Sequence, residues 1–386
     1  MLRFRQIYLL VVFLFALNTM QGAVSHPLVS DSIRISVVTC SAGGDIPTSF
    51  GHSAIRLRNS QAQPPIDILF DYGTFNYGDP LFLLKFGRGT LLYYLSVRDY
   101  STFAMECRAE RRQAVEQELL LSPEQRRRIA QLLWTNYRPE NRYYLYDFIT
   151  DNCATRIRDI LQHPDFQHTG ASPDSTYRQL IHTYLPQKHW FGFAVDALLG
   201  PSTDAKANFS QSLFLPYTLA EGLKSYGNTT TGKPLVSSSE VLVACDYVHV
   251  GEPWPLRPVF VFALLFVLSG WLYVSGHQRV LHGLAVGLFA LICVVGLVLL
   301  FLWLGSRYSC TKFNLNLLWC MPLYILLLLP LGTHSKRCVV LLQCGLLAFL
   351  LLLGWWALPQ QFNVAVYPLA ATLLLLNYNE LQIFRK

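Results

Sequence analysis

The sequence has few charged residues, and from Pro258 onward it has very few. Asp, Glu, Lys and Arg make up 14% of its 386 residues, whereas 52% are hydrophobic. Charges inside apolar segments usually mark a translocation path, and the C-terminal apolar runs offer little beyond His282, which lies near the end of one run. This scarcity argues against a transport protein.

Closely spaced pairs of cysteine or histidine are also lacking, although the chain has nine cysteines and ten histidines. A structural zinc site needs such spacing, so we expect neither a metal nor a cofactor. The net charge of +7 is modest, and the basic clusters lie close to glutamates that can pair with them. Nucleic acid is therefore not an expected partner.

The N-terminus has the order of a secretory signal peptide. Met-Leu-Arg-Phe-Arg precedes an apolar run from Ile7 to Leu17, and small residues follow at Ala23-Val24-Ser25. This pattern predicts a signal peptide over residues 1–25, with cleavage after Ser25. An uncleaved anchor is the alternative, but the apolar run is short for a membrane span.

Composition divides the rest of the chain into two parts. Residues 26–252 are mixed in character and predict one exported globular domain, whereas residues 253–386 predict a transmembrane domain. The basic residues of the expected cytoplasmic loops give a mild positive-inside bias, which places the globular domain outside the cytoplasm. Five spans are expected, at 258–275, 280–304, 315–331, 338–358 and 362–377.

Strands precede helices in the exported domain, which predicts an α+β fold. Alternating residues rich in Val and Ile predict strands at 33–40, 52–57, 66–75 and 91–97. Ser122, Pro123 and Gln125 form the start of a helix, with Ser122 as its cap and Gln125 closing a capping box.

Cys153 lies where the sequence predicts the first turn of another helix. Asp151 or Asn152 can cap this helix, and its buried face follows at helical spacing in Ala154, Ile157, Ile160 and Leu161. A thiol at a helix N-terminus is favoured as the reactive thiolate. A disulfide to Cys153 would exclude catalysis; the other exported thiols that an oxidising compartment could pair are Cys40, Cys107, Cys245 and Cys310.

A thiol nucleophile needs a base, and that base needs an orienting group. His52 opens a predicted strand after Gly51 and is the strongest candidate base, ahead of His182 and His189. Asp71 lies on the next strand and can hold the imidazole, with Asn76 and Asp151 as alternatives. Spacing alone also allows a buried structural cysteine and an inert histidine.

Three motifs together resemble the exported domain of the Lnb-type lipoprotein N-acyltransferases. They are Gly51-His52-Ser53-Ala54-Ile55-Arg56-Leu57, Phe70-Asp71-Tyr72-Gly73 and Asp151-Asn152-Cys153-Ala154-Thr155-Arg156. The order of signal peptide, exported domain and several spans is similar too, so the resemblance covers most of the chain. It implies a permuted papain-like fold of the NlpC/P60 type, in which histidine precedes cysteine, followed here by the five-helix transmembrane domain.

The resemblance implies an acyltransferase of the bacterial inner membrane with its catalytic domain in the periplasm. Cys153 would take an acyl chain from a membrane glycerophospholipid as a thioester. The α-amino group of the lipidated N-terminal cysteine of a diacylated apolipoprotein would then accept the chain, with His52 as base and Asp71 orienting it. The residues expected to contact substrate are Tyr72, Asn152 and Arg156.

Two other functions remain open on sequence. The first is a cysteine peptidase or amidase of NlpC/P60 type acting on the cell envelope, and the second is a non-catalytic envelope component. A hydrophobic groove facing the membrane favours acyl transfer, whereas a polar cleft away from the membrane favours the peptidase.

Overall fold

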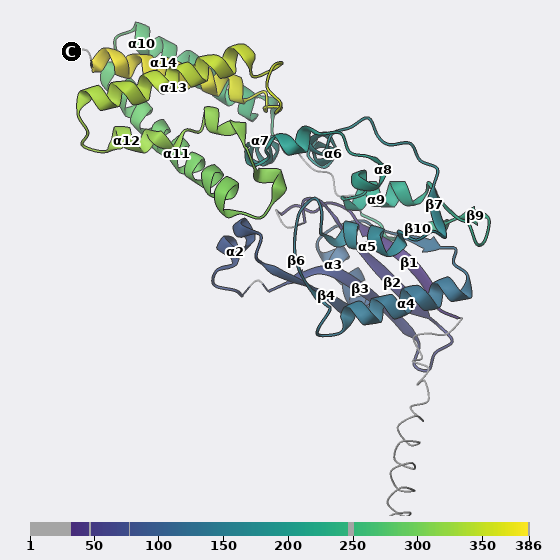
Figure 1. The fold of residues 1–386 in the computed structure, drawn as a ribbon. Helices are drawn as coiled ribbons and strands as arrows, with labels where there is room; N and C mark the ends of the chain where they lie inside the picture. The colour runs from purple at the N-terminus through teal and green to yellow at the C-terminus, as the bar shows by residue number, and fades with distance from the viewer. Residues whose placement is uncertain (1–31, 46–47, 77, 246–250, 385–386) are drawn as a thin grey trace, which may run out of the picture.

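The computed structural model describes residues 32–45, 48–76, 78–245 and 251–384. The expected signal peptide and the basic C-terminal pair Arg385-Lys386 lie outside these ranges. Strands and helices are mixed in the N-terminal part of the chain, and a helical region follows it (Figure 1). The α+β class expected for the exported domain is confirmed.

An antiparallel seven-stranded sheet forms the centre of the N-terminal part, in the order β10-β5-β1-β2-β3-β4-β6. The four strands expected from the sequence are present and occupy neighbouring positions. A small second sheet has the order β7-β8-β9. The strands are β1 Arg34–Cys40, β2 His52–Asn59, β3 Ile66–Phe75, β4 Leu92–Asp99, β5 Ala114–Leu119, β6 Tyr143–Leu145, β7 Phe166–His168, β8 Tyr226–Asn228, β9 Lys233–Pro234 and β10 Val236–Val243.

Helices cover both faces of the large sheet because its central strands are apolar on both sides. Alternate residues such as Ile55 and Phe70 face α4 (Pro123–Tyr137), α5 (Cys153–Leu161) and α9 (Pro216–Leu223). The intervening residues, among them Ala54 and Leu69, face α3 (Tyr100–Ala109). The predicted capping box at Ser122 is confirmed as the start of α4.

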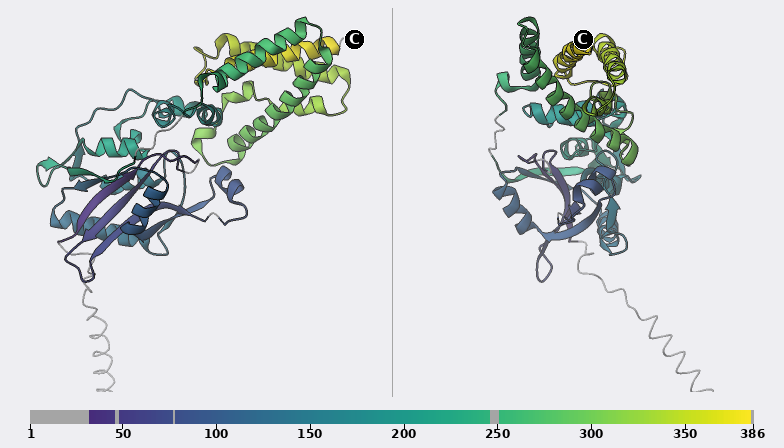
Figure 2. Two further views of the ribbon diagram at one scale, coloured as in Figure 1. Left: turned by 180° about the vertical axis from the view of Figure 1, so that it is seen from behind. Right: turned by 90° about the vertical axis from the view of Figure 1, so that its left-hand side faces the viewer.

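Short elements connect these layers to the membrane region. They are α2 (Phe82–Arg88), α6 (Tyr177–His182), α7 (His189–Leu198), η1 (Pro201–Asp204), α8 (Phe209–Ser212) and η2 (Trp254–Leu256). Figures 1 and 2 show α7 between the sheet domain and the helices that follow.

The C-terminal region consists of apolar helices gathered beyond one end of the sheet domain (Figure 2). Within the described part of the chain, α11 and α13 are long and apolar enough to cross a membrane, while α10 is shorter. The elements are α10 Pro258–Val274, α11 Gln278–Gly305, η3 Ser309–Thr311, η4 Leu315–Leu318, η5 Pro322–Tyr324, α12 Ile325–Leu328, α13 Thr333–Leu353 and α14 Val366–Ile383.

The span expected at 315–331 is not one straight helix. Segments Ser309–Leu318 and Pro322–Leu328 are bent by 51° at a break, which makes them a broken span or a re-entrant loop. Pro322 has no backbone N–H to continue a helix, and the chain breaks just before it. In place of the last two expected spans the structure has α13 at 333–353 and α14 at 366–383, and of these α13 is long and apolar enough to cross a membrane. The count of five spans stays a prediction, as do the domain boundaries at 25 and 252.

A buried polar network joins the two regions. The guanidinium of Arg178, 4% exposed, pairs with Asp196 at 2.9 Å and with Asp204 at 2.8 Å. From the helical region, the Asn363 side-chain amide donates to Asp196 Oδ2 at 2.8 Å, and the Asn316 amide donates to the Asp196 carbonyl at 3.0 Å. These contacts fix the exported domain against the helices.

Candidate active site

Cys153 is the first residue of α5, and Asn152 caps the helix. The Asn152 side-chain oxygen accepts from the backbone N–H groups of Ala154 at 2.9 Å and Thr155 at 3.0 Å. Its amide nitrogen donates to the carbonyls of Phe148 at 2.7 Å and Phe214 at 3.0 Å. This capping, which the sequence allowed for Asn152 or Asp151, holds Cys153 at the positive end of the helix.

His52 and Asp71 form a charged pair beside this helix end. His52 begins β2, and its Nε2 lies 2.5 Å from Asp71 Oδ1 on β3. Because Nε2 is engaged by Asp71, Nδ1 is the ring nitrogen that can form a hydrogen bond with the Cys153 thiol. The backbone N–H of Ser53 also donates to the Cys153 sulfur. The three residues expected to be catalytic are thus brought together.

Opposite pKa shifts follow from this arrangement. Burial lowers the pKa of His52, but Asp71 and the Cys153 thiolate outweigh it and raise that pKa well above its usual value. Burial raises the pKa of Cys153, and the pull of His52 together with the Ser53 N–H lowers it overall. The pair therefore favours thiolate and imidazolium, which is the reactive form of a cysteine nucleophile.

Gly73 provides the space in which these side chains meet. It lies at a register shift between β3 and β4 and has φ +113°, a conformation that side-chain-bearing residues rarely adopt. A Cβ at this position would lie 3.4 Å from His52 Cε1 and 3.9 Å from Cys153 Cβ. The bulge therefore brings bare backbone against both reacting groups.

Arg98, which sequence reasoning missed, supports Asp71 from β4. Its guanidinium lies 2.9 Å from Asp71 Oδ2, forms an ion pair with Glu106 and covers the Phe103 ring at 5.1 Å, both on α3. Burial raises the pKa of Asp71, but His52 and Arg98 lower it overall, so Asp71 stays ionised. The pairing register of β3 and β4 would have identified Arg98. Asp71 pairs with Ser96, and Arg98 lies two residues further along β4, on the same face of the sheet.

The three residues expected to contact substrate have partners within the protein. Tyr72 is 2% exposed, and its hydroxyl accepts from the Asn136 amide at 2.9 Å. Asn152 is the cap described above. Arg156 pairs with Asp151 at 2.5 Å and lies over the Tyr144 ring at 4.3 Å. Substrate binding by these residues stays a prediction; the observed contacts are structural.

The alternative bases and orienting groups lie elsewhere or are engaged. His182 pairs with Asp196 at 2.9 Å in the network between the two regions, and the His189 backbone N–H donates to Glu252 at 3.0 Å. Asp151 is occupied by Arg156, as above, and Asn76 accepts from the Gly78 N–H at 2.9 Å. Asp71 is therefore the group whose contact with His52 fits the orienting role.

All nine cysteines, Cys153 included, are free thiols in the structure. Of the four exported candidates for disulfides, Cys40 and Cys107 lie together, with their sulfur atoms 3.3 Å apart in the core. The Cys245 thiol instead donates to the Arg111 carbonyl at 2.6 Å. No contact engages Cys153 in a disulfide, so its sulfur is available for chemistry.

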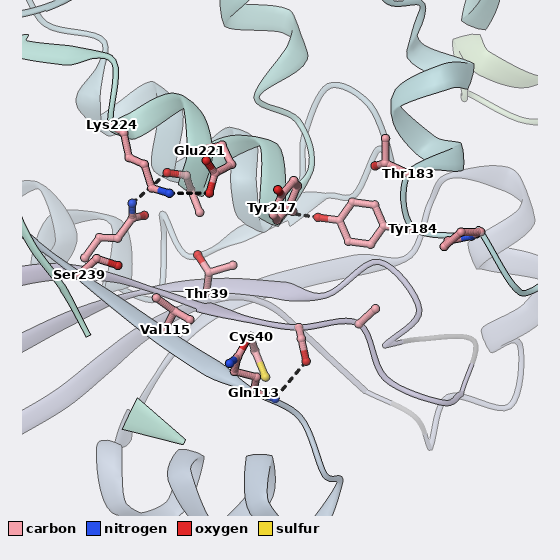
Figure 3. Close-up of a pocket in the computed structure, with 15 residues that line it drawn as sticks. Thr39, Cys40, Gln113, Val115, Thr183, Tyr184, Tyr217, Glu221, Lys224 and Ser239 are labelled. Carbon is pink, nitrogen blue, oxygen red and sulfur yellow. Dashed lines mark hydrogen bonds and ion pairs between the residues drawn. The ribbon is translucent and has the colours of Figure 1, made fainter. Parts of the chain in front are cut away.

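A cavity of about 410 Å³ lies next to the site, between the sheet and α9 (Figure 3). Thr39 is on its floor and pairs in register with Ser53, whose N–H bonds Cys153. Tyr184 and Tyr217 form one wall, where the Tyr217 N–H donates to the Tyr184 hydroxyl at 2.5 Å. Sequence reasoning missed this cavity because its lining comes from segments far apart in the chain.

Aromatic side chains lie on the other side of the site. Tyr146 stacks on Tyr93 at 4.5 Å, and Phe50 lies 4.9 Å from Phe148 and 5.9 Å from Tyr184. Burial raises the pKa of Tyr146 well above its usual value, and neighbouring Tyr93 and Cys153 add to the effect. The phenol therefore stays neutral, and this side of the site is lined by aromatic rings.

Comparison with known proteins gives two matches along the chain. Residues 24–183 match the family described as the Lnb N-terminal periplasmic domain, and residues 251–386 match the Lnb transmembrane domain. His52, Asp71 and Cys153 all lie within the first match. No curated protein and no solved structure matches the chain.

Proposed function

The chain belongs to the Lnb family, a family of membrane enzymes of lipoprotein maturation, and we propose that it is a lipoprotein N-acyltransferase with Cys153 as its nucleophile. The observation that carries the proposal is the His52–Asp71 pair placed beside a thiol at a capped helix N-terminus. A periplasmic domain joined to apolar helices makes it an inner-membrane protein.

The first half-reaction forms a thioester. The Cys153 thiolate attacks an ester carbonyl of a glycerophospholipid, and the resulting oxyanion is stabilised by the Cys153 backbone N–H, which has no acceptor within the first turn of α5. The C–O bond then breaks. The His52 imidazolium gives its proton to the departing lysophospholipid oxygen, which leaves the acyl chain on sulfur.

The second half-reaction transfers the chain to an amine. The α-amino group of a diacylated apolipoprotein attacks the thioester carbonyl, and neutral His52 accepts a proton from this nitrogen. The C–S bond breaks as the amide forms, and Cys153 returns as thiolate paired with imidazolium. Asp71, held by Arg98, keeps the imidazole oriented and favours its charged form in both steps.

Membrane attachment supports lipid substrates over soluble ones. Both proposed substrates are held in the bilayer by acyl chains, so an enzyme anchored beside them meets them by diffusion in two dimensions. The aromatic side of the site also suits an acyl chain better than a polar peptide.

A transfer assay in liposomes tests the proposal. The full-length protein is mixed with phosphatidylethanolamine and a synthetic diacylated lipopeptide, and we expect a lipopeptide heavier by one acyl chain. The same lipopeptide with an acetylated α-amino group should gain no acyl chain. The Cys153→Ala variant should not transfer an acyl chain to the free lipopeptide. Cleavage of the peptide without acyl transfer would instead support a peptidase and contradict the proposal.

A further inference from the structure

Helix α2 and the residue before it carry a row of exposed apolar side chains. Leu81 is 54% exposed, Leu83 81%, Leu84 47% and Phe86 40%, and α2 itself buries none of its residues. Contiguous exposed side chains of this size are unusual on a surface that faces only water. We refer to these four residues as the α2 apolar surface.

The position of α2 relates this surface to the membrane. A Cβ at Gly87 would lie 3.3 Å from Phe301 Cε1 and 3.8 Å from Leu302 Cδ2, in the last turns of α11. The Arg307 N–H, just beyond α11, donates to the Arg88 carbonyl at 3.1 Å. Helix α11 is long and apolar enough to span a bilayer, and α2 lies beside one end of it (Figure 1), where such a span would reach the membrane surface.

The neighbouring residues identify the occupant as lipid. Leu304 is 73% exposed and Phe313 66% exposed, and Phe313 packs against Trp303 at 5.4 Å, as in an aromatic belt at the membrane interface. Arg88 supplies positive charge in the last turn of α2, where a lipid phosphate can meet it, whereas Lys85 in the same turn pairs with Asp79 at 2.5 Å. Exposed apolar and aromatic side chains next to a basic residue, close to the end of a membrane span, fit a lipid better than a second protein.

Aromatic side chains connect the α2 apolar surface to the nucleophile. Phe86 stacks on Tyr146 at 6.4 Å, and Phe82 stacks on Phe75 at 5.5 Å. Tyr146 packs in the same cluster as Cys153, and Phe75 follows Gly73 by two residues. Packed aromatic rings therefore connect the α2 apolar surface to the side chains around Cys153.

We propose that α2 is an interfacial lipid-binding helix, which inserts Leu81, Leu83 and Leu84 into the outer leaflet and presents the donor phospholipid to Cys153. The insertion is argued from the exposure of these side chains and the position of α2 beside α11. The presentation of a donor rests on the proposed function. Two experiments separate these parts.

Site-specific crosslinking tests the insertion. The photoreactive residue p-benzoylphenylalanine is placed at Leu83 in the full-length protein, in nanodiscs of phosphatidylethanolamine and phosphatidylglycerol. After irradiation we expect a mass increase of one phospholipid. The matched control places it at Met105, which is 59% exposed on α3 at the other face of the sheet and should give no lipid adduct. No lipid adduct at 83, an equal adduct at 105, or a crosslink to protein would overturn the proposal.

Substitution tests the presentation of the donor. We expect the double variant Leu83→Asp, Leu84→Asp to form the Cys153 acyl adduct from vesicle lipid at least about tenfold more slowly, because two apolar anchors are lost. Alkylation of Cys153 by water-soluble iodoacetamide should stay within about twofold, since the thiolate is untouched. Leu132→Asp, at another exposed leucine (39% exposed, on α4), should change neither rate.

The outcomes distinguish the two hypotheses. Unchanged acylation in the double variant, or a parallel fall in alkylation, contradicts the presentation role of α2. Absence of any adduct in the wild type contradicts the proposed function and with it the presentation role, while the crosslinking result still decides whether α2 binds lipid.

Discussion

The His52 and Cys153 side chains hold each other in their charged forms, and this makes the site sensitive to pH. The pKa of Cys153 is lowered by His52 and that of His52 is raised by Cys153 and Asp71, so each group favours the charged form of the other. Acyl-enzyme formation needs thiolate to attack and imidazolium to protonate the leaving group. Its rate should therefore fall on the acid side as Cys153 gains a proton, and on the alkaline side as His52 loses one.

Asp71→Asn should move the alkaline limb of this profile to lower pH. The substitution removes the charge that raises the pKa of His52, so the imidazolium loses its proton sooner. We also expect a rate at neutral pH lower by about tenfold or more. The measurement is the pH dependence of acyl-enzyme formation. Asp151→Asn, whose carboxylate pairs with Arg156 instead, should leave the alkaline limb in place; a shift in both variants would contradict the assignment.

Gly73→Ala should reduce both stability and activity. The left-handed backbone costs about 1–3 kcal/mol for a residue with a side chain, and the new Cβ meets His52 and Cys153. Gly232→Ala is the control, because Gly232 also has positive φ, +65°, but nothing within 4 Å of an added Cβ. Thermal unfolding and acylation rates should show a stability loss in both variants and an activity loss in Gly73→Ala alone.

At the scale of elements, the cap of α5 does more than begin a helix. Asn152→Ala removes the cap, worth about 1 kcal/mol, and also the bonds to the Phe148 and Phe214 carbonyls that seat Cys153. Ser122→Ala removes the equivalent cap of α4, away from the site. We expect both variants to lose unfolding free energy, Asn152→Ala more because it also leaves two carbonyls unpaired, but a lower acylation rate only for Asn152→Ala. Equal activity in the two variants would show that the Asn152 cap has no positioning role.

Elements with a strong local signal could be predicted, and elements defined by distant pairing could not. Strands β1 to β4 alternate clearly, and the helix starts at Ser122 and Asn152 carry side chains that cap their own backbone. Strand β10 is rich in serine and becomes a strand only by pairing with β5, more than a hundred residues earlier. Likewise, the order of the strands was enough to predict that His52 and Asp71 lie close together. The contact of Arg98 with Asp71 and with α3 could be found only from the pairing register of β3 and β4.

At the scale of the whole molecule, the buried Arg178 network determines how the exported domain sits on the helices. Arg178→Ala would remove the guanidinium that pairs with both Asp196 and Asp204, leaving Asp196 with only His182 and Asn363 as side-chain partners, and we expect this to cost about 3–5 kcal/mol. Lys206→Ala breaks an exposed pair with Asp174 and should change the unfolding free energy little. Thermal unfolding of both variants in nanodiscs measures the difference. A small effect for Arg178→Ala would mean that the two regions are held by apolar contacts instead.

The central claim is that Cys153 carries an acyl chain taken from a phospholipid, and intact-protein mass spectrometry tests it most directly. The full-length protein is incubated with phosphatidylethanolamine of defined acyl chains, without acceptor, and then digested to locate the modification. The account predicts one added acyl chain on Cys153 that hydroxylamine removes, and none in Cys153→Ser under the same conditions. Two results together would contradict it: Cys153 stays unmodified in the folded wild-type protein, and the Cys153→Ala variant still supports lipoprotein N-acylation in cells.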